Sequence, residues 1–207
     1  MYQPLPDSSN ANDGSWRIRV VQQPTNAKAA QGAKEKSRSP IDPPPIVKLD
    51  TFPHLSLHDP YIMVVASSVP TGKHEGESSQ QHAKNMTGSM VSSLHRLKDL
   101  QNQESGFFIF PDLLIKIPGD FKLHFALMKM KTNPSDPGDL GEWETVAETD
   151  SDPFKVYTSK DYPGMAESTV MTRSFSDQGV KVRLRKDSRK LTTAKRNHQV
   201  AQNARNT

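Results

Sequence analysis

The chain has 207 residues, a hydrophobic fraction of 33%, 16 prolines and no cysteine. Globular domains are roughly 45–50% apolar on a count that includes glycine, so we expect one modest core and much irregular chain. The lack of cysteine excludes disulfides, cysteine-ligated zinc, iron–sulfur clusters and thiol nucleophiles. No apolar run approaches the roughly 18–20 residues that span a bilayer, and no signal-peptide pattern is present, so we expect an intracellular protein without a membrane partner.

The net charge of +4 is distributed unevenly along the chain. Residues 181–207 carry nine basic residues against one acid, and residues 16–40 carry six against one. Residues 133–152, by contrast, carry seven acids and neither lysine nor arginine. This segregation favours one surface that faces a polyanion and another that is acidic, although solvated charge runs are also common.

Period-2 alternation in some segments, and short apolar runs bounded by turn residues in others, predict a series of short strands. The predicted strands are residues 16–21, 46–49, 61–66, 90–97, 107–110, 113–117, 121–130, 143–146, 154–157 and 180–186. In one of them, Phe121, Leu123, Phe125 and Leu127 fall on a single face. The turn signal at residues 118–120 predicts that the two strands around it are antiparallel partners.

One segment, residues 166–178, is predicted to be a helix, with Gly179 as its terminator. Many short strands with almost no helix predict a mainly β fold, an antiparallel β-sandwich, with one or two short helices. We place the domain at residues 15–186, after a disordered lead at 1–14 and before a basic disordered tail at 187–207. Residues 25–40 and 71–88 are expected to be an exposed loop and a surface insertion.

The sequence gives little support to an enzyme. His54 and His58 are four residues apart, but prolines bracket them and no third ligand is evident, so a metal site is not expected. His95 and His124 lie in predicted strands and are interpreted as structural or exposed histidines. We find no glycine-rich phosphate loop, nucleophile elbow or paired-carboxylate motif. We therefore expect no catalytic residues, no metal and no cofactor.

Two basic segments are candidate DNA contacts. Lys34, Lys36 and Arg38 alternate, so in an extended loop their heads would project to one side and could meet successive phosphates. A flexible charged loop that only keeps the protein soluble is an equally good interpretation. Arg183 and Arg185 alternate out of the last predicted strand and could add phosphate contacts.

The residues that follow have a second interpretation. A bipartite nuclear-import signal is suggested by five basic residues: Lys186, Arg189, Lys190, Lys195 and Arg196. A solvated tail is the alternative. Ser39 precedes Pro40 among the loop cations, which makes it a candidate phosphorylation point whose phosphate would oppose a DNA backbone. The simpler interpretation is that Ser39 begins the turn into the proline run.

Seven motifs follow one another along the chain: WRIRVVQQP, KEKSRSPIDPPPIVKL, DPYIMVVAS, GSMVSSLHRLKD, GFFIFPDLLIKIPGDFKLHFALMKM, PFKVYTSKDYPGMAEST and QGVKVRLRK. In this order they resemble the velvet domain of fungal developmental regulators. The resemblance covers roughly residues 15–186. SSLHRLKD and GFFIFPDL are specific, because generic β-sandwiches do not share them.

This resemblance implies an immunoglobulin-like β-sandwich similar to the Rel-homology DNA-binding domain. It further implies a nuclear regulator of spore development and secondary metabolism that binds double-stranded DNA as a homodimer or as a heterodimer with other velvet proteins. In relatives the basic residues ahead of the proline run form the contact loop, which corresponds here to Lys34, Lys36 and Arg38. The chain departs from these relatives at Ser37, where they often carry an aromatic or acidic residue, and at Ser39, where they often carry a basic one.

Two other functions are weighed against DNA binding. The runner-up is a velvet interaction subunit that heterodimerises and makes little direct DNA contact. A carbohydrate- or ligand-binding sandwich is disfavoured because the chain has only two tryptophans and four tyrosines to line such a site.

Overall fold

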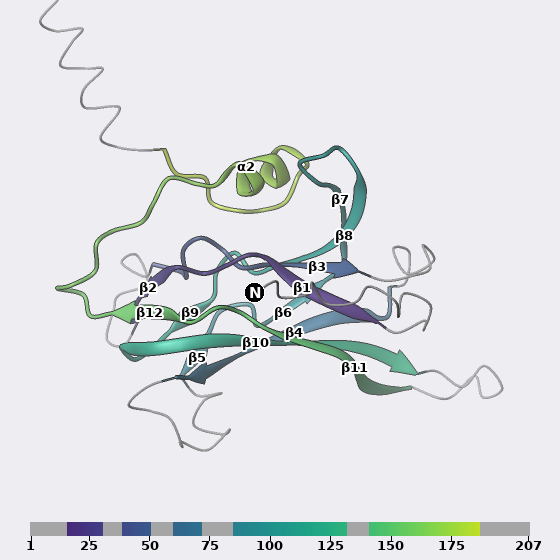
Figure 1. Ribbon diagram of the computed structural model, residues 1–207, viewed down its shortest axis with the longest axis horizontal. Coiled ribbons are helices and arrows are strands. Elements are labelled where there is room, and N and C mark those ends of the chain that lie inside the picture. Colours follow the sequence, from purple (N-terminus) through teal and green to yellow (C-terminus); the bar gives the residue numbers. More distant parts are fainter. Residues whose placement is uncertain (1–15, 31–38, 51–59, 72–84, 132–140, 187–207) are drawn as a thin grey trace, which may run out of the picture.

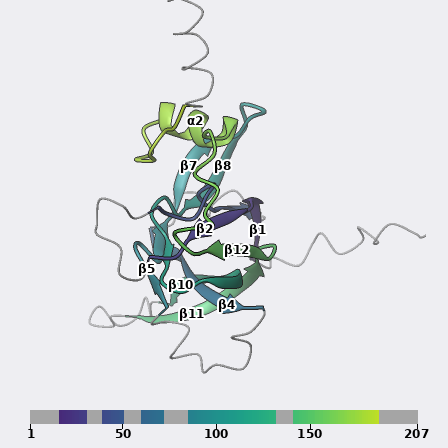
Figure 2. The ribbon, with the colours of Figure 1, turned by 90° about the vertical axis from the view of Figure 1, so that its left-hand side faces the viewer.

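Two sheets packed face to face, with one helix against the outer face of the first, make up the described part of the chain (Figures 1 and 2). The computed structural model describes residues 16–30, 39–50, 60–71, 85–131 and 141–186. The first sheet is antiparallel and has the strand order β1-β3-β8-β7. Its strands are β1 (Arg17–Gln22), β3 (Ile46–Asp50), β7 (His95–Lys98) and β8 (Glu104–Ile109).

The second sheet is larger and has the order β2-β12-β10-β4-β6, with β11 also paired to β10. Its strands are β2 (Asn26–Lys28), β4 (Ile62–Pro70), β6 (Val91–Ser93), β10 (Gly119–Lys131), β11 (Glu142–Asp150) and β12 (Phe154–Tyr157). All neighbours are antiparallel except β2 and β12, which are parallel. A third sheet of two short strands pairs β5 (Met86–Thr87) with β9 (Leu114–Ile115).

The main core lies between the two large sheets. The four apolar residues predicted to share a face of β10, Phe121 to Leu127 in alternation, are all fully buried. Val47, Leu49 and Phe108 meet them from the first sheet. Alternation is the reason, because successive side chains of a strand point to opposite faces and only one face of β10 meets another layer.

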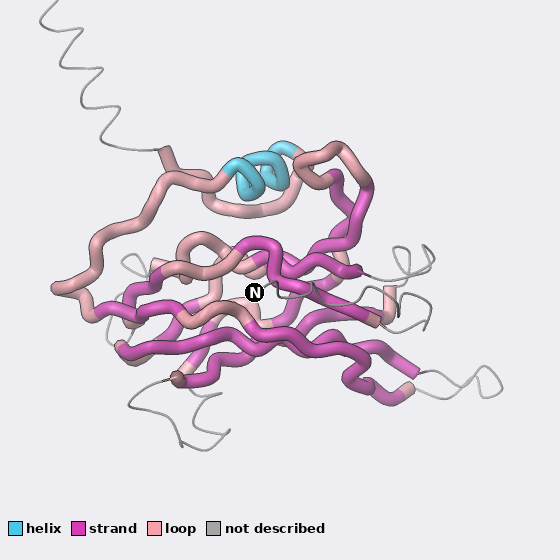
Figure 3. Tube along the Cα trace, viewed as in Figure 1, coloured by secondary structure: helices cyan, strands magenta, loops and turns pink. Residues whose placement is uncertain are grey.

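The helix α2 (Val170–Asp177) covers the outer face of the first sheet. Phe175 inserts into a second apolar cluster with Ile46, Leu97, Phe107 and Ile109. The loop after β12 crosses one end of the sandwich to reach this helix (Figure 3). Strand β8 is therefore buried on both faces, which accounts for the uninterrupted apolar run at residues 107–110.

The prediction of a mainly β sandwich with a short helix is confirmed, and the helix keeps its predicted end. It begins at Val170, four residues later than expected, because the Thr169 hydroxyl caps it by accepting a hydrogen bond from the Thr172 N–H at 3.0 Å. Gly179 follows the C-cap with φ +96°, a left-handed conformation that glycine adopts without steric cost.

Several strand predictions were wrong in detail. Residues 180–186 form no strand, because their backbone bonds to the end of α2 and to Ser168 rather than to a sheet edge. Residues 90–97 divide into β6 and β7, which belong to different sheets. Residues 113–117 are not paired with β10, whose neighbours are β4, β11 and β12.

Two predicted irregular segments contain strands. Ala27, expected in an exposed loop, is fully buried in β2, where a methyl side chain fits beside β12. Met86, at the end of the expected insertion, is buried in β5. Both strands are too short and too poor in large apolar residues to show periodicity. The predicted lead at 1–14, most of the insertion and the predicted tail at 187–207 lie outside the described residues.

Candidate nucleic-acid interface

The loop that carries Lys34, Lys36 and Arg38 lies outside the described residues, but both of its ends are described. On the entry side, the Ala30 N–H donates to the Ile115 carbonyl at 2.9 Å. On the exit side, the Ile41 N–H donates to the Leu113 carbonyl at 2.9 Å. The short segment around β9 therefore holds both ends of the loop, and the loop leaves and rejoins the sandwich at the same end.

The two ends are also bonded directly to each other through Asp42. The Asp42 carbonyl accepts the N–H groups of Thr25 and Asn26, each at 3.0 Å, and the Asp42 N–H donates to the Asn26 carbonyl at 2.9 Å. The described residues on the two sides of the basic loop are thus bonded to each other, and we call this group of hydrogen bonds the base of the loop.

The side chain of Asp42 joins this base to the C-terminal basic segment. Its Oδ2 accepts the Ala166 N–H at 2.7 Å, and its Oδ1 lies 3.3 Å from an Arg185 guanidinium nitrogen. The Arg185 N–H donates to the Ser168 hydroxyl at 2.8 Å. Arg185, predicted as a DNA contact, is therefore engaged within the protein, and its side chain is only 20% exposed.

Burial dominates the electrostatics of this cluster. It lowers the pKa of the Arg185 guanidinium, and the Asp42 carboxylate opposes that shift. Arginine nevertheless stays charged at neutral pH. Burial, with the Asp42 charge adding to it, raises the pKa of Tyr162 to about 12. The Tyr162 hydroxyl is buried and has no hydrogen-bond partner among the described residues, so it is a neutral neighbour of the ion pair.

The other cations of the C-terminal segment are exposed. Lys181, Arg183 and Lys186 are exposed, as is Leu184, whereas Val182 and Arg185 are half-buried. Arg183 is thus the predicted DNA contact of this segment whose side chain faces solvent. Of the predicted import signal, Lys186 is exposed, and the remaining four residues, Arg189, Lys190, Lys195 and Arg196, lie outside the described residues.

Sequence reasoning missed Asp42, which holds the loop base together. Its signal is visible in hindsight: Asp42 is the single acid in residues 39–47, placed between Ile41 and three prolines where a solvated charge has no evident purpose. An acid in apolar surroundings has to find partners when it is buried. Ser39 is half-buried at the exit of the loop, and its phosphorylation stays a prediction.

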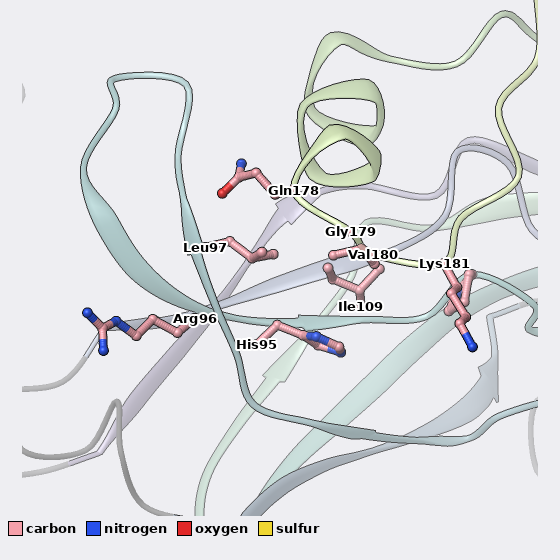
Figure 4. A pocket seen from close by; sticks show the side chains of 9 residues that line it. His95, Arg96, Leu97, Ile109, Gln178, Gly179, Val180 and Lys181 are labelled. Carbon is pink, nitrogen blue, oxygen red and sulfur yellow. The ribbon is translucent and has the colours of Figure 1, made fainter.

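A groove of about 550 Å³ lies between β7 and the first residues of the C-terminal basic segment, which follow α2 (Figure 4). Its walls include His95, Arg96, Leu97, Ile109, Val180 and Lys181. Burial lowers the pKa of His95 below its ordinary value of 6.5. His95 is thus a partly buried histidine at the rim of the outer core, in keeping with the structural role expected for it.

His124 lies on the other sheet and belongs to an ion-pair cluster. Its Nδ1 is 2.8 Å from an Asp150 carboxylate oxygen, which connects β10 to β11. Lys122 holds the second oxygen of the same carboxylate at 2.5 Å. Among the described residues, no three histidine or acidic side chains are grouped closely enough to hold a metal ion. His54 and His58 lie outside the described residues.

The fold and this site define a class: a two-sheet β-sandwich in which the described residues flanking a basic loop are bonded to the start of a basic C-terminal segment. A family model described as Velvet factor matches residues 16–61 and 58–188. The chain belongs to the velvet family, as its motifs indicated. Within the described residues, no helix has the length and apolar character needed to cross a membrane.

Curated relatives carry regulatory names. The chain is 45% identical over 197 residues to the spore development regulator VOSA of Pyricularia oryzae, covering 92% of this chain and 37% of that protein. It is 41% identical over 196 residues to a velvet complex subunit of Chaetomium globosum, covering 91% and 42%. It is 34% identical over 202 residues to the developmental and secondary metabolism regulator veA of Dothistroma septosporum, covering 86% and 33%. The chain thus spans roughly two fifths or less of these relatives' lengths.

Proposed function

We propose that this chain is a nuclear regulator of fungal spore development and secondary metabolism that binds double-stranded DNA through the loop containing Lys34, Lys36 and Arg38. Its relatives are named as regulators of spore development, of development in general and of secondary metabolism. Regulation, rather than catalysis, is what these names support. Arg183 is proposed as an additional phosphate contact.

One observation carries the proposal: described residues next to the two most basic segments of the chain are bonded to each other at one end of the fold. They are separated by more than a hundred residues in sequence, yet Arg185 contacts Asp42 at the base of the basic loop. Residues 16–40 and 181–207 have net charges of +5 and +8 on an otherwise acidic chain. Loop cations and tail cations that start from a shared base would add their positive potentials and attract a duplex.

The chemistry of the contact follows from the side chains. Lysine and arginine neutralise phosphates and release condensed counterions, so the affinity falls steeply as salt rises. Phosphate contacts orient the protein, whereas base contacts specify the sequence. Arg38 is the candidate for a base contact, because a guanidinium can donate two hydrogen bonds to guanine O6 and N7 in the major groove.

Partners and location complete the proposal. A relative named as a velvet complex subunit supports another velvet protein as the partner, in a homodimer or a heterodimer. The basic residues 186–196 are proposed to bind the nuclear import machinery. Truncation after Lys186, followed by localisation of a fluorescent fusion, tests import separately from DNA affinity. A fusion that still accumulates in the nucleus contradicts the import proposal.

The decisive experiment replaces Lys34, Lys36 and Arg38 together by alanine. We expect an unchanged fold, a loss of affinity for a random-sequence duplex pool, and a salt-dependence slope reduced by about one for each lost phosphate contact. The matched control replaces Arg19, Lys122 and Lys131, which form ion pairs on strands β1 and β10. A loop variant with unchanged slope and affinity would remove the loop from the mechanism.

One observation favours the interaction-subunit alternative: Arg185, an expected DNA contact, is bonded to Asp42 within the protein. It predicts that the purified chain alone does not shift a duplex, while the chain with a velvet partner does so independently of the loop cations. Mobility-shift assays of the chain alone, and then with a partner, separate the two functions.

A further inference from the structure

We propose that Arg185 is a positioning residue and not a DNA contact: its guanidinium holds the C-terminal basic segment on Asp42, so that Arg183 and the basic loop address the same duplex. This inference rests on the proposed DNA binding. It assigns different roles to two arginines that are indistinguishable in sequence, since both follow the same alternation.

The hydrogen bonds around Asp42 form a clasp with two sides. On one side, the backbone of Asp42 bonds to Thr25 and Asn26 and so closes the base of the loop. On the other side, its carboxylate receives the Ala166 N–H and the Arg185 guanidinium. One residue therefore fixes both the loop and the C-terminal segment.

The backbone of Arg185 is fixed as firmly as its side chain. The Ser168 N–H donates to the Arg185 carbonyl at 3.1 Å, and the Arg185 N–H donates to the Ser168 hydroxyl at 2.8 Å. These bonds hold the backbone of the segment at Ser168. Within the same segment Arg185 is turned inward, whereas Arg183 and Lys181 are exposed.

Burial explains why the ion pair is needed. The Asp42 side chain is only 4% exposed, and a buried carboxylate is costly unless it is paired and hydrogen-bonded. Its described polar partners are the Ala166 N–H and Arg185, so Arg185 supplies the compensating charge. An arginine engaged in this way would have to abandon a buried anion in order to reach a phosphate.

The expected benefit for DNA binding is preorganisation. Cations that are already held in place lose less conformational freedom when they bind, so more of the interaction energy appears as affinity. Releasing the C-terminal segment would leave Arg183 tethered but mobile, which weakens binding without removing a phosphate contact from the loop.

The test uses Asp42→Asn, for which the two roles predict opposite signs. If Arg185 contacts DNA, removing the anion frees its guanidinium and deletes a repulsive charge, so the duplex binds more tightly. If Arg185 is a positioning residue, the clasp opens, the preorganisation of the C-terminal segment is lost, and we expect affinity to fall by about three- to fivefold. Tighter or unchanged binding overturns the proposal.

A double-mutant cycle adds the second discriminating result. In the Asp42→Asn background, Arg185→Met should cost no further affinity, because its partner is already lost, whereas a direct contact would cost the same in both backgrounds. The double variant removes both charges and leaves no unpaired buried ion. Arg183→Met is the matched control, for which we expect the salt slope to fall by about one.

Hydrogen exchange separates failure of this inference from failure of DNA binding. Without DNA, Asp42→Asn and Arg185→Met should accelerate exchange at the Ser168 and Arg185 amides and leave β10 protected. Arg183→Met, the control, should leave exchange at these two amides unchanged. Unchanged exchange refutes the clasp even if DNA binds. Faster exchange in a chain that shifts no duplex retains the clasp but refutes the proposed function and the role assigned to it.

Discussion

Phe175→Ala should detach the helix from the sandwich, because Phe175 is the fully buried apolar side chain that α2 inserts into the outer core. Its ring centroid lies 4.7 Å from that of Phe107, with the rings tilted by 56°. Ile46, Leu97 and Ile109 complete the site. An eight-residue helix is not stable in water by itself, so α2 depends on this contact.

The magnitude follows from the buried area. A buried phenylalanine removes about 150–250 Å² from water, which at about 25 cal/mol per Å² is roughly 4–6 kcal/mol as an upper estimate. Alanine retains one methyl group, and buried Phe→Ala substitutions cost about 3–5 kcal/mol. We therefore expect the free energy of unfolding to fall by about 4 kcal/mol, unless α2 undocks before the sheets unfold.

Urea unfolding with hydrogen exchange distinguishes these outcomes. A loss of about 4 kcal/mol lowers the urea midpoint by about 2 M for an m-value near 2 kcal/mol/M. Undocking instead removes exchange protection from α2 while β10 stays protected. The control is Val170→Ala on the same helix, where the side chain is 66% exposed and a change within about 0.5 kcal/mol is expected. A loss below about 1 kcal/mol with α2 still protected would refute this account of helix docking.

Two further predictions concern backbone strain and pH. Gly88 has φ +100°, and an added Cβ would lie 2.3 Å from the Asp112 carbonyl oxygen, whereas Gly164 has φ +99° and nothing within 4 Å. Gly88→Ala should therefore lower the melting temperature more than Gly164→Ala, because the second substitution carries only the conformational cost of about 1–2 kcal/mol. Equal losses in the two variants would contradict the steric clash at Gly88. Burial lowers the pKa of His95 in the folded state, so the unfolded state takes up the proton more readily and stability falls as the pH drops below 6.5. His95→Gln should make urea midpoints less dependent on pH in that range, and an unchanged dependence would show that His95 is not responsible.

The sequence predicted the elements of the fold better than their partners. Alternation at residues 121–127 identified both the strand and its buried face, because periodicity is a local property. The turn at residues 118–120 suggested a hairpin that does not form. The carbonyls of Leu113 and Ile115 instead accept hydrogen bonds from N–H groups at the ends of the basic loop. A local sequence pattern cannot predict this pairing, because the bonded residues are far apart in the chain.

The candidate site was predicted in composition but not in geometry. The charge pattern and the velvet motifs were enough to identify the loop cations and Arg183 as candidate contacts. Alternation along a strand predicted that Arg183 and Arg185 would both be exposed. For Arg185 this was wrong, because the segment is not a strand and a buried acid 143 residues away in sequence draws Arg185 inward. Charge counts record how many cations are present and not which of them are already paired.

The sequence by itself determined the class of fold, the family and the segregation of charge, since each depends on residue types and their spacing along the chain. The tertiary structure decided which strands pair, how α2 is held by Phe175, and that the two basic segments meet through Asp42 and Arg185. These features depend on distances between residues far apart in the chain. Such distances are set by packing of the two sheets and the helix, to which every element contributes at once.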